Sequence, residues 1–286
     1  MTSEAIDALE ILQSPCVLCP RRCGARRAGG ERGVCGTGAE AVVASYGAHF
    51  GEEDILVGRG GSGTIFLSGC NLRCAFCQNA DISMSVTGRK TPAEKLAGFM
   101  LALEREGCEN VNFVTPTHHA PQVAAAVLAA KGMGFAKPVV YNCGGYEGLE
   151  GLRLLEGVVD IYMPDAKFMS KEASKRYLDA EDYPERMQEA LVEMQRQVGA
   201  LVIRGGVAAR GLLVRHLAMP AHAEDSRKVI DFLAEQIGPG TYVNVMGQYR
   251  PRHRAAEFGE ISRATDWAEV AALMRYAMER GLRVDD

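Results

Sequence analysis

The chain has 286 residues and is 47% hydrophobic, which is enough for one large core or for a core with a small appendage. Its 32 Lys and Arg residues nearly balance 36 Asp and Glu residues, and a formal net charge of −4 argues against a nucleic-acid binder with a strong basic field. The sequence begins without the basic and apolar regions of a signal peptide, and no apolar run could span a bilayer, so we expect a cytoplasmic protein with no membrane partner.

The first group of cysteines lies in the N-terminal forty residues, with the spacing Cys16-x2-Cys19-x3-Cys23-x11-Cys35. Clustered cysteines in a chain without an export signal predict a metal site rather than disulfides. Four thiolates suit zinc and an iron–sulfur cluster equally well. Zinc would make the segment structural or partner-binding, whereas a cluster would allow it to relay electrons. The surrounding arginines form either a solvated face or a docking surface for an acidic protein or peptide.

Residues 41–58 are predicted to form two short strands, or a strand and a loop, and a regular alternation of strands and helices begins at residue 63. Six short segments are apolar and rich in branched or aromatic residues, as are strands buried on both faces of a parallel sheet. These predicted strands are 64–67, 111–115, 138–142, 158–163, 212–218 and 242–246, with a further small strand at 201–204.

Helix boundaries are marked between these strands. Thr91-Pro92-Ala93-Glu94 predicts a capping box with a proline at the first helical position, and Gly107 marks the end of that helix. Pro121 and Pro184 open two further helices, and Asp266 begins the last one. The apolar stripes on these helices are interpreted as core.

Six strands that alternate with helices predict an α/β fold built from right-handed βαβ units with a parallel sheet. Because a closed barrel of this kind has eight units, we expect a partial (β/α)6 barrel with its chemistry at the carboxyl ends of the strands. The predicted organisation is a four-cysteine segment with short strands over residues 1–60, followed by the barrel over residues 61–286.

The second group of cysteines directly follows the first predicted strand of this series. Its spacing is Cys70-x3-Cys74-x2-Cys77, with three cysteines within eight residues and no fourth nearby. A structural iron–sulfur cluster normally uses four thiolates, so three thiolates on a [4Fe–4S] cluster leave one iron open for a substrate. The alternatives are a zinc site or three unrelated core cysteines.

This motif, with Phe76 before the last cysteine, resembles the signature of the radical S-adenosylmethionine (SAM) superfamily. Residues 69–79 are similar to the corresponding stretch of pyruvate formate-lyase activating enzyme, and the chain as a whole resembles the homologues of that enzyme. The resemblance implies a [4Fe–4S] cluster that binds and reductively cleaves SAM, forming a 5′-deoxyadenosyl radical that abstracts hydrogen from a substrate. It also implies an electron donor such as flavodoxin or ferredoxin.

The same resemblance implies which residues contact SAM. Asp165 and Lys167 are similar to the Asp-x-Lys motif that lies beside the SAM carboxylate in activating enzymes. Phe76, Cys77 and Gln78 match the segment that touches adenine. Tyr249 lies near a further position that contacts SAM in that family.

Three positions depart from the family pattern or leave alternatives open. Asn142 stands where activating enzymes have an aspartate, and it is either a SAM contact or a strand-end cap. The usual Gly-Gly-Glu stretch is replaced by Thr115-Pro116-Thr117-His118-His119, so Thr117 or His118 would receive the SAM amino group, or the amine is held differently. Alternation in the fifth strand points either Arg215 or His216 inward, toward SAM or a structural ion pair.

The sequence therefore predicts SAM-dependent hydrogen abstraction, with a glycine of a partner glycyl-radical enzyme as the leading substrate. Modification of another peptide or of a small molecule is the alternative within the same chemistry. A zinc-dependent binding protein without catalysis is the alternative from a different class. The residues give no prediction for a catalytic side chain, and they do not identify the substrate.

Overall fold

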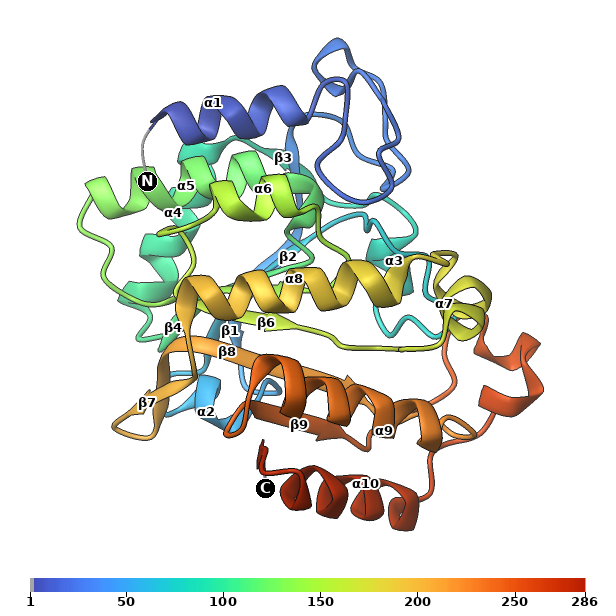
Figure 1. Ribbon diagram of the computed structural model, residues 1–286. Coiled ribbons are helices and arrows are strands. Elements are labelled where there is room, and N and C mark those ends of the chain that lie inside the picture. Colours follow the sequence, from blue (N-terminus) through green and yellow to red (C-terminus); the bar gives the residue numbers. More distant parts are fainter. Residues whose placement is uncertain (1–2, 286) are drawn as a thin grey trace.

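The computed structural model describes residues 3–285 of the chain, and its helices flank one large sheet (Figure 1). The α-helices are α1 (Ser3–Leu12), α2 (Asp54–Val57), α3 (Ala80–Ser83), α4 (Ala93–Arg105), α5 (Ala120–Gly132), α6 (Leu149–Leu154), α7 (Lys171–Leu178), α8 (Tyr183–Val198), α9 (Ala223–Phe232) and α10 (Trp267–Glu279). Short helical turns add η1 (Arg27–Gly29), η2 (Thr117–His119), η3 (Leu233–Ile237), η4 (Ala255–Glu257) and η5 (Gly259–Ile261).

The sheet is mostly parallel and open at both ends. Its strands are β1 (Ala41–His49), β2 (Ser62–Leu67), β3 (Arg89–Thr91), β4 (Asn110–Val114), β5 (Val139–Cys143), β6 (Ile161–Pro164), β7 (Val202–Arg204), β8 (Val207–Leu217), β9 (Tyr242–Met246) and β10 (Arg283–Val284). Their order is β10-β9-β8-β6-β5-β4-β2-β1-β3, and β7 pairs with β8 outside this path. The pairs from β2 to β10 along the path are parallel, and those of β1 with β2 and β3 are antiparallel.

The six predicted strands correspond to β2, β4, β5, β6, β8 and β9, and the predicted α/β class with a parallel sheet is confirmed. The central strands β4 and β5 are buried almost throughout, which explains why their sequences are apolar without alternation. The additional small strand is present as β7, which is antiparallel to β8.

The helices form one continuous layer along the sheet. Helix α4 packs on β2 and β4, α8 on β6 and β8, and α10 on β9. Neighbouring helices also contact each other, because α4 packs on α5, α6 on α8, and α9 on α10. Helix α1 closes the gap between α5 and α6, and Figure 1 shows it lying across both. The crossover helices therefore shield the sheet on one side and leave the strand ends for the site.

Two local predictions differ from the structure. Residues 41–58 form one long strand, β1, followed by the short helix α2, because β1 pairs with both β2 and β3 and so extends to nine residues. The predicted capping box is wrong: Thr91 belongs to β3, where its hydroxyl donates to the carbonyl of Arg89, and Pro92 takes the capping position of α4.

Within residues 3–285, none of the helices combines the length and the apolar character that crossing a membrane requires.

Candidate active site

A cavity of about 280 Å³ lies at the carboxyl ends of the parallel strands. Leu67 at the end of β2 and Met246 at the end of β9 both line it, although these strands stand far apart in the sheet order. Val114, Cys143 and Leu217 bring the ends of β4, β5 and β8 to the same cavity. The strands thus converge on one site, where folds of this type place their chemistry.

The loop after β2 carries Cys70, Cys74 and Cys77, and all three thiols line this cavity. The loop is fixed to the carboxyl end of α7, where the backbone amide of Arg73 donates to the carbonyl of Leu178 at 3.2 Å. The amide of Ala75 likewise donates to the carbonyl of Tyr177 at 2.7 Å. These bonds satisfy carbonyls that the helix end leaves without partners, so the cysteine loop has a defined position.

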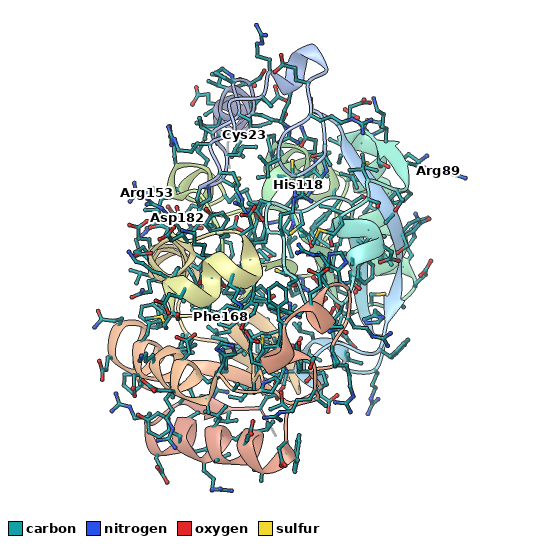
Figure 2. The ribbon with its side chains drawn as sticks, turned by 90° about the vertical axis from the view of Figure 1, so that its right-hand side faces the viewer. Cys23, Arg89, His118, Arg153, Phe168 and Asp182 are labelled. Carbon is teal, nitrogen blue, oxygen red and sulfur yellow. The ribbon has the colours of Figure 1, made fainter. Side chains whose placement is uncertain are left out.

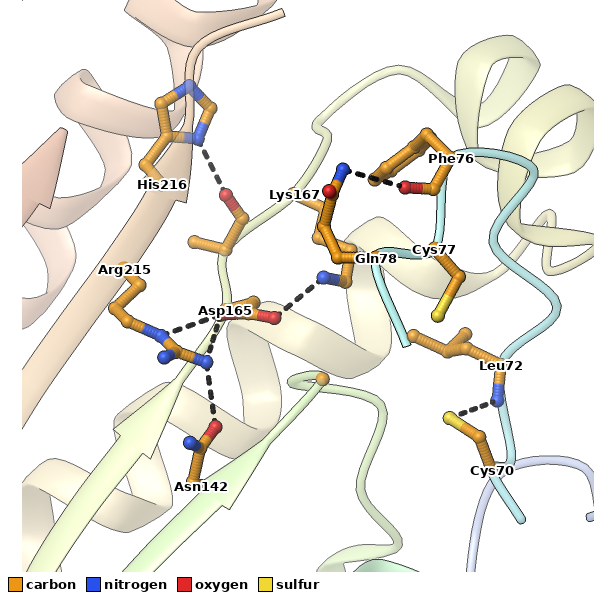
Figure 3. A network of polar contacts seen from close by, with 12 residues as sticks. Cys70, Leu72, Phe76, Cys77, Gln78, Asn142, Asp165, Lys167, Arg215 and His216 are labelled. Atoms are coloured by element: carbon orange, nitrogen blue, oxygen red, sulfur yellow. Dashed lines mark hydrogen bonds and ion pairs between the residues drawn. The ribbon is translucent and has the colours of Figure 1, made fainter. Parts of the chain in front are cut away.

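Four side chains on or just after β5, β6 and β8 form a polar network on the opposite wall of the cavity, as Figure 3 shows. Asp165, just after β6, accepts from Lys167 Nζ at 2.6 Å and from Arg215 Nε at 3.0 Å. The guanidinium of Arg215 also donates to Asn142 Oδ1 at 2.7 Å. Asp165, Lys167, Arg215 and Asn142 therefore meet in one place, and a SAM contact from any of them stays a prediction.

The network continues into the segment between β1 and α2. Arg215 lies 3.6 Å from Glu52 and 3.8 Å from Glu53, two buried carboxylates that the sequence did not single out. Burial raises the pKa of Glu52 to about 7, against the opposing effect of the Arg215 charge. Asn244 of β9 donates to Glu53 at 3.3 Å, which ties this segment to the last strand of the series.

Ion pairing keeps both members of the Asp165–Lys167 pair charged. Burial opposes ionisation of Asp165, but Arg215 and Lys167 outweigh it and hold the pKa of this carboxyl below its ordinary value. Burial would also lower the pKa of Lys167, and the Asp165 carboxylate reverses the effect and raises it. A charged ammonium whose side chain is 14% exposed therefore faces the cavity beside the cysteine loop.

An aromatic and amide wall completes the cavity. Phe76 packs edge-on against Phe168 and Tyr249, with ring centroids 6.1 and 6.2 Å apart. The Tyr249 hydroxyl donates to the carbonyl of Ile261, so its ring and not its hydroxyl is available to a ligand. Gln78 donates to the carbonyl of Arg250 at 3.1 Å and also lines the cavity.

Two of the residues predicted to bind SAM lie outside the cavity lining. The buried hydroxyl of Thr117 donates to Glu147 Oε1 at 2.6 Å, and Thr115 lines the cavity instead. His216 is buried, with its Nδ1 2.6 Å from the carbonyl of Ala166, while its neighbour Arg215 points to the cavity. A SAM contact from Thr117 or His216 stays a prediction.

Sequence reasoning missed Glu147, which lies in the loop before α6. It is 4% exposed and accepts hydrogen bonds from Thr117 and Tyr141. Burial raises its pKa to about 7, although these bonds oppose the shift. No local pattern distinguishes a buried glutamate from a surface one, so tertiary structure was needed to find it.

The N-terminal cysteines gather at a second, smaller cavity. Cys16, Cys19, Cys23 and Cys35 line it together with the buried side chains of Arg27 and His118 and with Asn71 of the other cysteine loop. Figure 2 shows Cys23 on the N-terminal segment and His118 beneath it. Across residues 3–285, no three Cys, His, Asp or Glu side chains are already grouped as they would be around a single metal ion.

Comparison with known proteins adds a family. The model of the Radical SAM superfamily matches residues 64–203, which include the cysteine loop and the strands from β4 to β6. Uncharacterized protein MJ0674 of Methanocaldococcus jannaschii is 32% identical over 276 residues, covering 93% of this chain and 75% of that protein.

Solved structures share the fold at low sequence identity. SuiB of Streptococcus suis, bound to the precursor peptide SuiA, is 12% identical with a TM-score of 0.53, over 76% of this chain and 46% of SuiB. Methylornithine synthase, PylB, is also 12% identical with a TM-score of 0.52, over 77% of this chain and 63% of PylB. The chain thus spans less than half of SuiB, and the shared part is the α/β fold.

Proposed function

The chain belongs to the radical SAM superfamily, and from this premise we propose that it cleaves SAM reductively to abstract hydrogen from a substrate. Enzymes of this superfamily use a [4Fe–4S] cluster and SAM. The observation that carries the proposal is the convergence of Cys70, Cys74 and Cys77 on one cavity with the charged network of Asp165 and Lys167.

In this proposal each of the three cysteines binds one iron. A cluster with four irons held in this way would leave one iron without a protein ligand, and the amino and carboxylate groups of SAM would have that iron available. When bound, the reduced cluster supplies the electron that splits SAM into methionine and a 5′-deoxyadenosyl radical. The protein's contribution is to position SAM and to keep water out of the cavity.

Lys167 and Arg215 are the proposed contacts for the carboxylate of SAM. Their side chains are only 14% and 16% exposed, and the Asp165 carboxylate holds both in place, so a ligand meets preorganised donors. Phe76 and Gln78 offer a ring face and an amide to the adenine. Asn142 would be a further hydrogen-bonding group, because its Oδ1 is occupied by Arg215 while its amide remains available.

We also propose that the open sheet is curved as a partial (β/α)6 barrel. Leu67 and Met246, from the first and last strands of the series, line the same cavity, and Asn244 of β9 donates to Glu53, which precedes α2. A flat sheet would separate the ends of β2 and β9 by four intervening strands, namely β4, β5, β6 and β8. Small-angle X-ray scattering that fits a flat α/β sandwich better than this curved form would contradict the proposal.

The substrate is proposed to be a residue of a peptide or protein. SuiB, which shares the fold, binds a precursor peptide, and this supports a peptide substrate. A glycine of a glycyl-radical enzyme is one such residue, favoured by the resemblance of residues 69–79. Methylornithine synthase shares the fold equally well, so a small molecule is the alternative. Incubation with SAM, reductant and a panel of both classes separates them.

The decisive experiment is anaerobic reconstitution with iron and sulfide, followed by dithionite and SAM. We expect 5′-deoxyadenosine and methionine from the wild-type protein. Cys70→Ala, Cys74→Ala and Cys77→Ala should each abolish the product, whereas Cys108→Ala, which removes a buried thiol far from both cavities, should retain it.

Absence of 5′-deoxyadenosine from a protein that has bound iron would overturn the proposal. Zinc at all the cysteines would instead support a binding protein without catalysis. A low-potential flavodoxin or ferredoxin is proposed as the natural electron donor, because dithionite only replaces such a protein.

A further inference from the structure

We propose that the four-cysteine segment holds an iron–sulfur cluster that passes electrons to the cluster of Cys70, Cys74 and Cys77. This inference rests on the proposed function, since it assigns a source for the electron that SAM cleavage consumes. Zinc would satisfy the same four thiolates, but the position of the segment and the charges around it favour an electron-carrying cluster.

The two cysteine loops are in direct contact. A Cβ atom placed on Gly69, the residue before Cys70, would lie 2.5 Å from the carbonyl oxygen of Cys35. His118 lines the four-cysteine cavity, and its Nε2 donates to the carbonyl of Ser68 at 2.9 Å. Cys35 of the first cysteine group is therefore in backbone contact with Gly69, which directly precedes Cys70 of the second group. Because electron transfer falls steeply with distance, this adjacency favours transfer between the two sites.

Arginines lock this contact in place. Arg21, between Cys19 and Cys23, donates to the carbonyl of Asn71 at 2.9 Å and to that of Leu178 at 3.2 Å. In the other direction, Arg73 of the second loop donates to the carbonyl of Val34. Each loop therefore holds the other by a side chain, which fixes the separation of the two sites.

Arg27 shows that the four-cysteine cavity needs a negative charge. Its side chain is 1% exposed, yet its hydrogen bonds go to the neutral carbonyl of Gly38 and the hydroxyl of Thr37. Arg27 Nη1 also donates to Cys16 Sγ at 3.9 Å, and among the described residues Arg27 has no carboxylate within ion-pair distance. A buried cation requires a compensating anion. Four thiolates around a metal centre carry net negative charge and would supply it.

The outer side of the cavity can receive an electron. Cys16, Cys19 and Cys35 are buried, whereas Cys23 is partly exposed. Beside it, Arg22 and Arg32 are exposed, and neither forms an ion pair with another described residue. The four-cysteine cavity thus has one wall against the Cys70 loop and the other beneath a basic rim formed by Arg22 and Arg32. This arrangement suits a site that receives an electron at the surface and passes it to the Cys70 loop. The rim fits an acidic one-electron donor protein, such as a flavodoxin.

Electron transfer through the four-cysteine segment neither forms nor breaks a covalent bond, and each electron that enters the segment also leaves it. The donor protein is oxidised by one electron, and the four-cysteine cluster is reduced by it. That cluster is reoxidised when it passes the electron to the cluster of Cys70, Cys74 and Cys77. Each SAM cleaved consumes one electron in this way, and the segment itself takes up no substrate.

The first arm of the test is metal content with Mössbauer and EPR spectroscopy. Two [4Fe–4S] clusters predict about eight irons per wild-type chain and about four in either Cys16→Ser/Cys19→Ser or the triple Cys70→Ala/Cys74→Ala/Cys77→Ala variant. The cluster that remains in the triple variant should be indifferent to SAM, because all four of its irons have thiolate ligands. Zinc in that variant would overturn the inference.

The second arm compares two reductants. Cys16→Ser/Cys19→Ser should cleave SAM with dithionite but lose at least about tenfold in rate with reduced flavodoxin. Arg22→Glu/Arg32→Glu keeps every cysteine and should show the same selective loss, so the test does not depend on the first variant folding. Arg59→Glu/Arg89→Glu reverses the same charge at exposed positions away from the segment and is the control.

The outcomes separate this inference from the proposed function. If wild-type protein fails to cleave SAM even with dithionite, the proposed function fails. If it cleaves SAM with dithionite, but flavodoxin serves the Cys16→Ser/Cys19→Ser variant as well as the wild type, only the relay is overturned.

Discussion

Gly69 determines how closely the two cysteine loops approach each other. Its φ of 84° lies in the left-handed region, where a side chain costs roughly 1 to 2 kcal/mol. A Cβ there would also meet the carbonyl oxygen of Cys35 at 2.5 Å and the side chain of Thr37 at 2.8 Å. Backbone cannot yield as a flexible side chain would, so the contact depends on glycine.

We therefore expect Gly69→Ala to lower the free energy of unfolding by at least about 2 kcal/mol and to reduce the iron bound at both sites. Gly98→Ala is the matched control. Gly98 is an exposed helical residue whose added Cβ would meet nothing within 4 Å, and the change should stabilise the chain by about 0.5 to 1 kcal/mol. Urea denaturation and iron assays check both, and wild-type iron content in Gly69→Ala would contradict the argument.

Substitution of Lys167 is the most specific test of the polar network's role in SAM binding. Lys167→Met removes the ammonium but keeps an unbranched chain of similar length, so the cluster should still assemble. Loss of a charge-assisted hydrogen bond of about 1.5 to 3 kcal/mol predicts weaker SAM binding by roughly 10- to 100-fold. Lys171→Met, which breaks an exposed ion pair with Glu185, should leave SAM affinity unchanged. Equal affinities in the two variants would exclude Lys167 from the site.

The raised pKa of Glu147 predicts that the stability of the fold depends on pH. Burial raises its folded-state pKa to about 7 from 4.5, so the folded protein holds this proton where the unfolded chain has released it. The contribution of Glu147 to the free energy of unfolding is therefore complete below about pH 4.5, and it is lost as the pH rises through about 7. Full loss amounts to roughly 3 kcal/mol.

Glu147→Gln, a neutral mimic of the protonated acid, should accordingly match the wild type near pH 5 and exceed its stability at pH 8. Chemical denaturation across this range measures the difference between the two proteins. Glu150→Gln, at an exposed position three residues later, is the control. A constant difference from pH 5 to 8 would show that Glu147 is ionised throughout.

At the scale of elements, helix α7 supports the cysteine loop. Its last residues offer the carbonyls of Tyr177 and Leu178 to that loop, and Leu178 also receives Arg21 of the four-cysteine segment. At its other end, the Ser170 hydroxyl caps the helix by accepting from the amide of Ala173. A single short helix thus supports both sites.

Loss of this cap tests that role. Ser170→Ala should cost about 1 kcal/mol of stability and speed the release of iron to a chelator. Asp266→Ala removes an equivalent cap, on α10, at a similar cost. Because α10 does not contact the cysteine loop, iron release from that variant should match the wild type. Equal rates of iron release from the two variants would contradict the role of α7 in supporting the cysteine loop.

Elements with a strong periodic signal could be predicted from the sequence, and those defined by pairing could not. The parallel strands were found because burial on both faces makes them continuously apolar, as in β5. The length of β1 was not, since its outer half is exposed and owes its structure to pairing with β2. The capping box at Thr91 failed because pairing of β3 with β1 holds that residue in a strand.

At the scale of the whole molecule, one part of the site could likewise be predicted from the sequence and another part could not. The spacing of Cys70, Cys74 and Cys77 is local, so the sequence reveals it, and the family match extends over that motif. Glu52, Glu53 and Glu147 are functional candidates only because the fold buries them, and adjacent acidic residues in a sequence are usually solvated. The contacts between the two cysteine groups join residues 34 to 50 positions apart in the sequence, from Gly69 with Cys35 (69 − 35) to Arg21 with Asn71, which no local pattern encodes.

The account depends on an iron that has no ligand from the protein. EPR of the dithionite-reduced Cys16→Ser/Cys19→Ser variant, recorded with and without SAM, isolates the cluster of Cys70, Cys74 and Cys77 and tests this most directly. We predict a [4Fe–4S] signal whose g values shift when SAM is added, because SAM binds the open iron. A signal that is unchanged by saturating SAM would contradict the central claim.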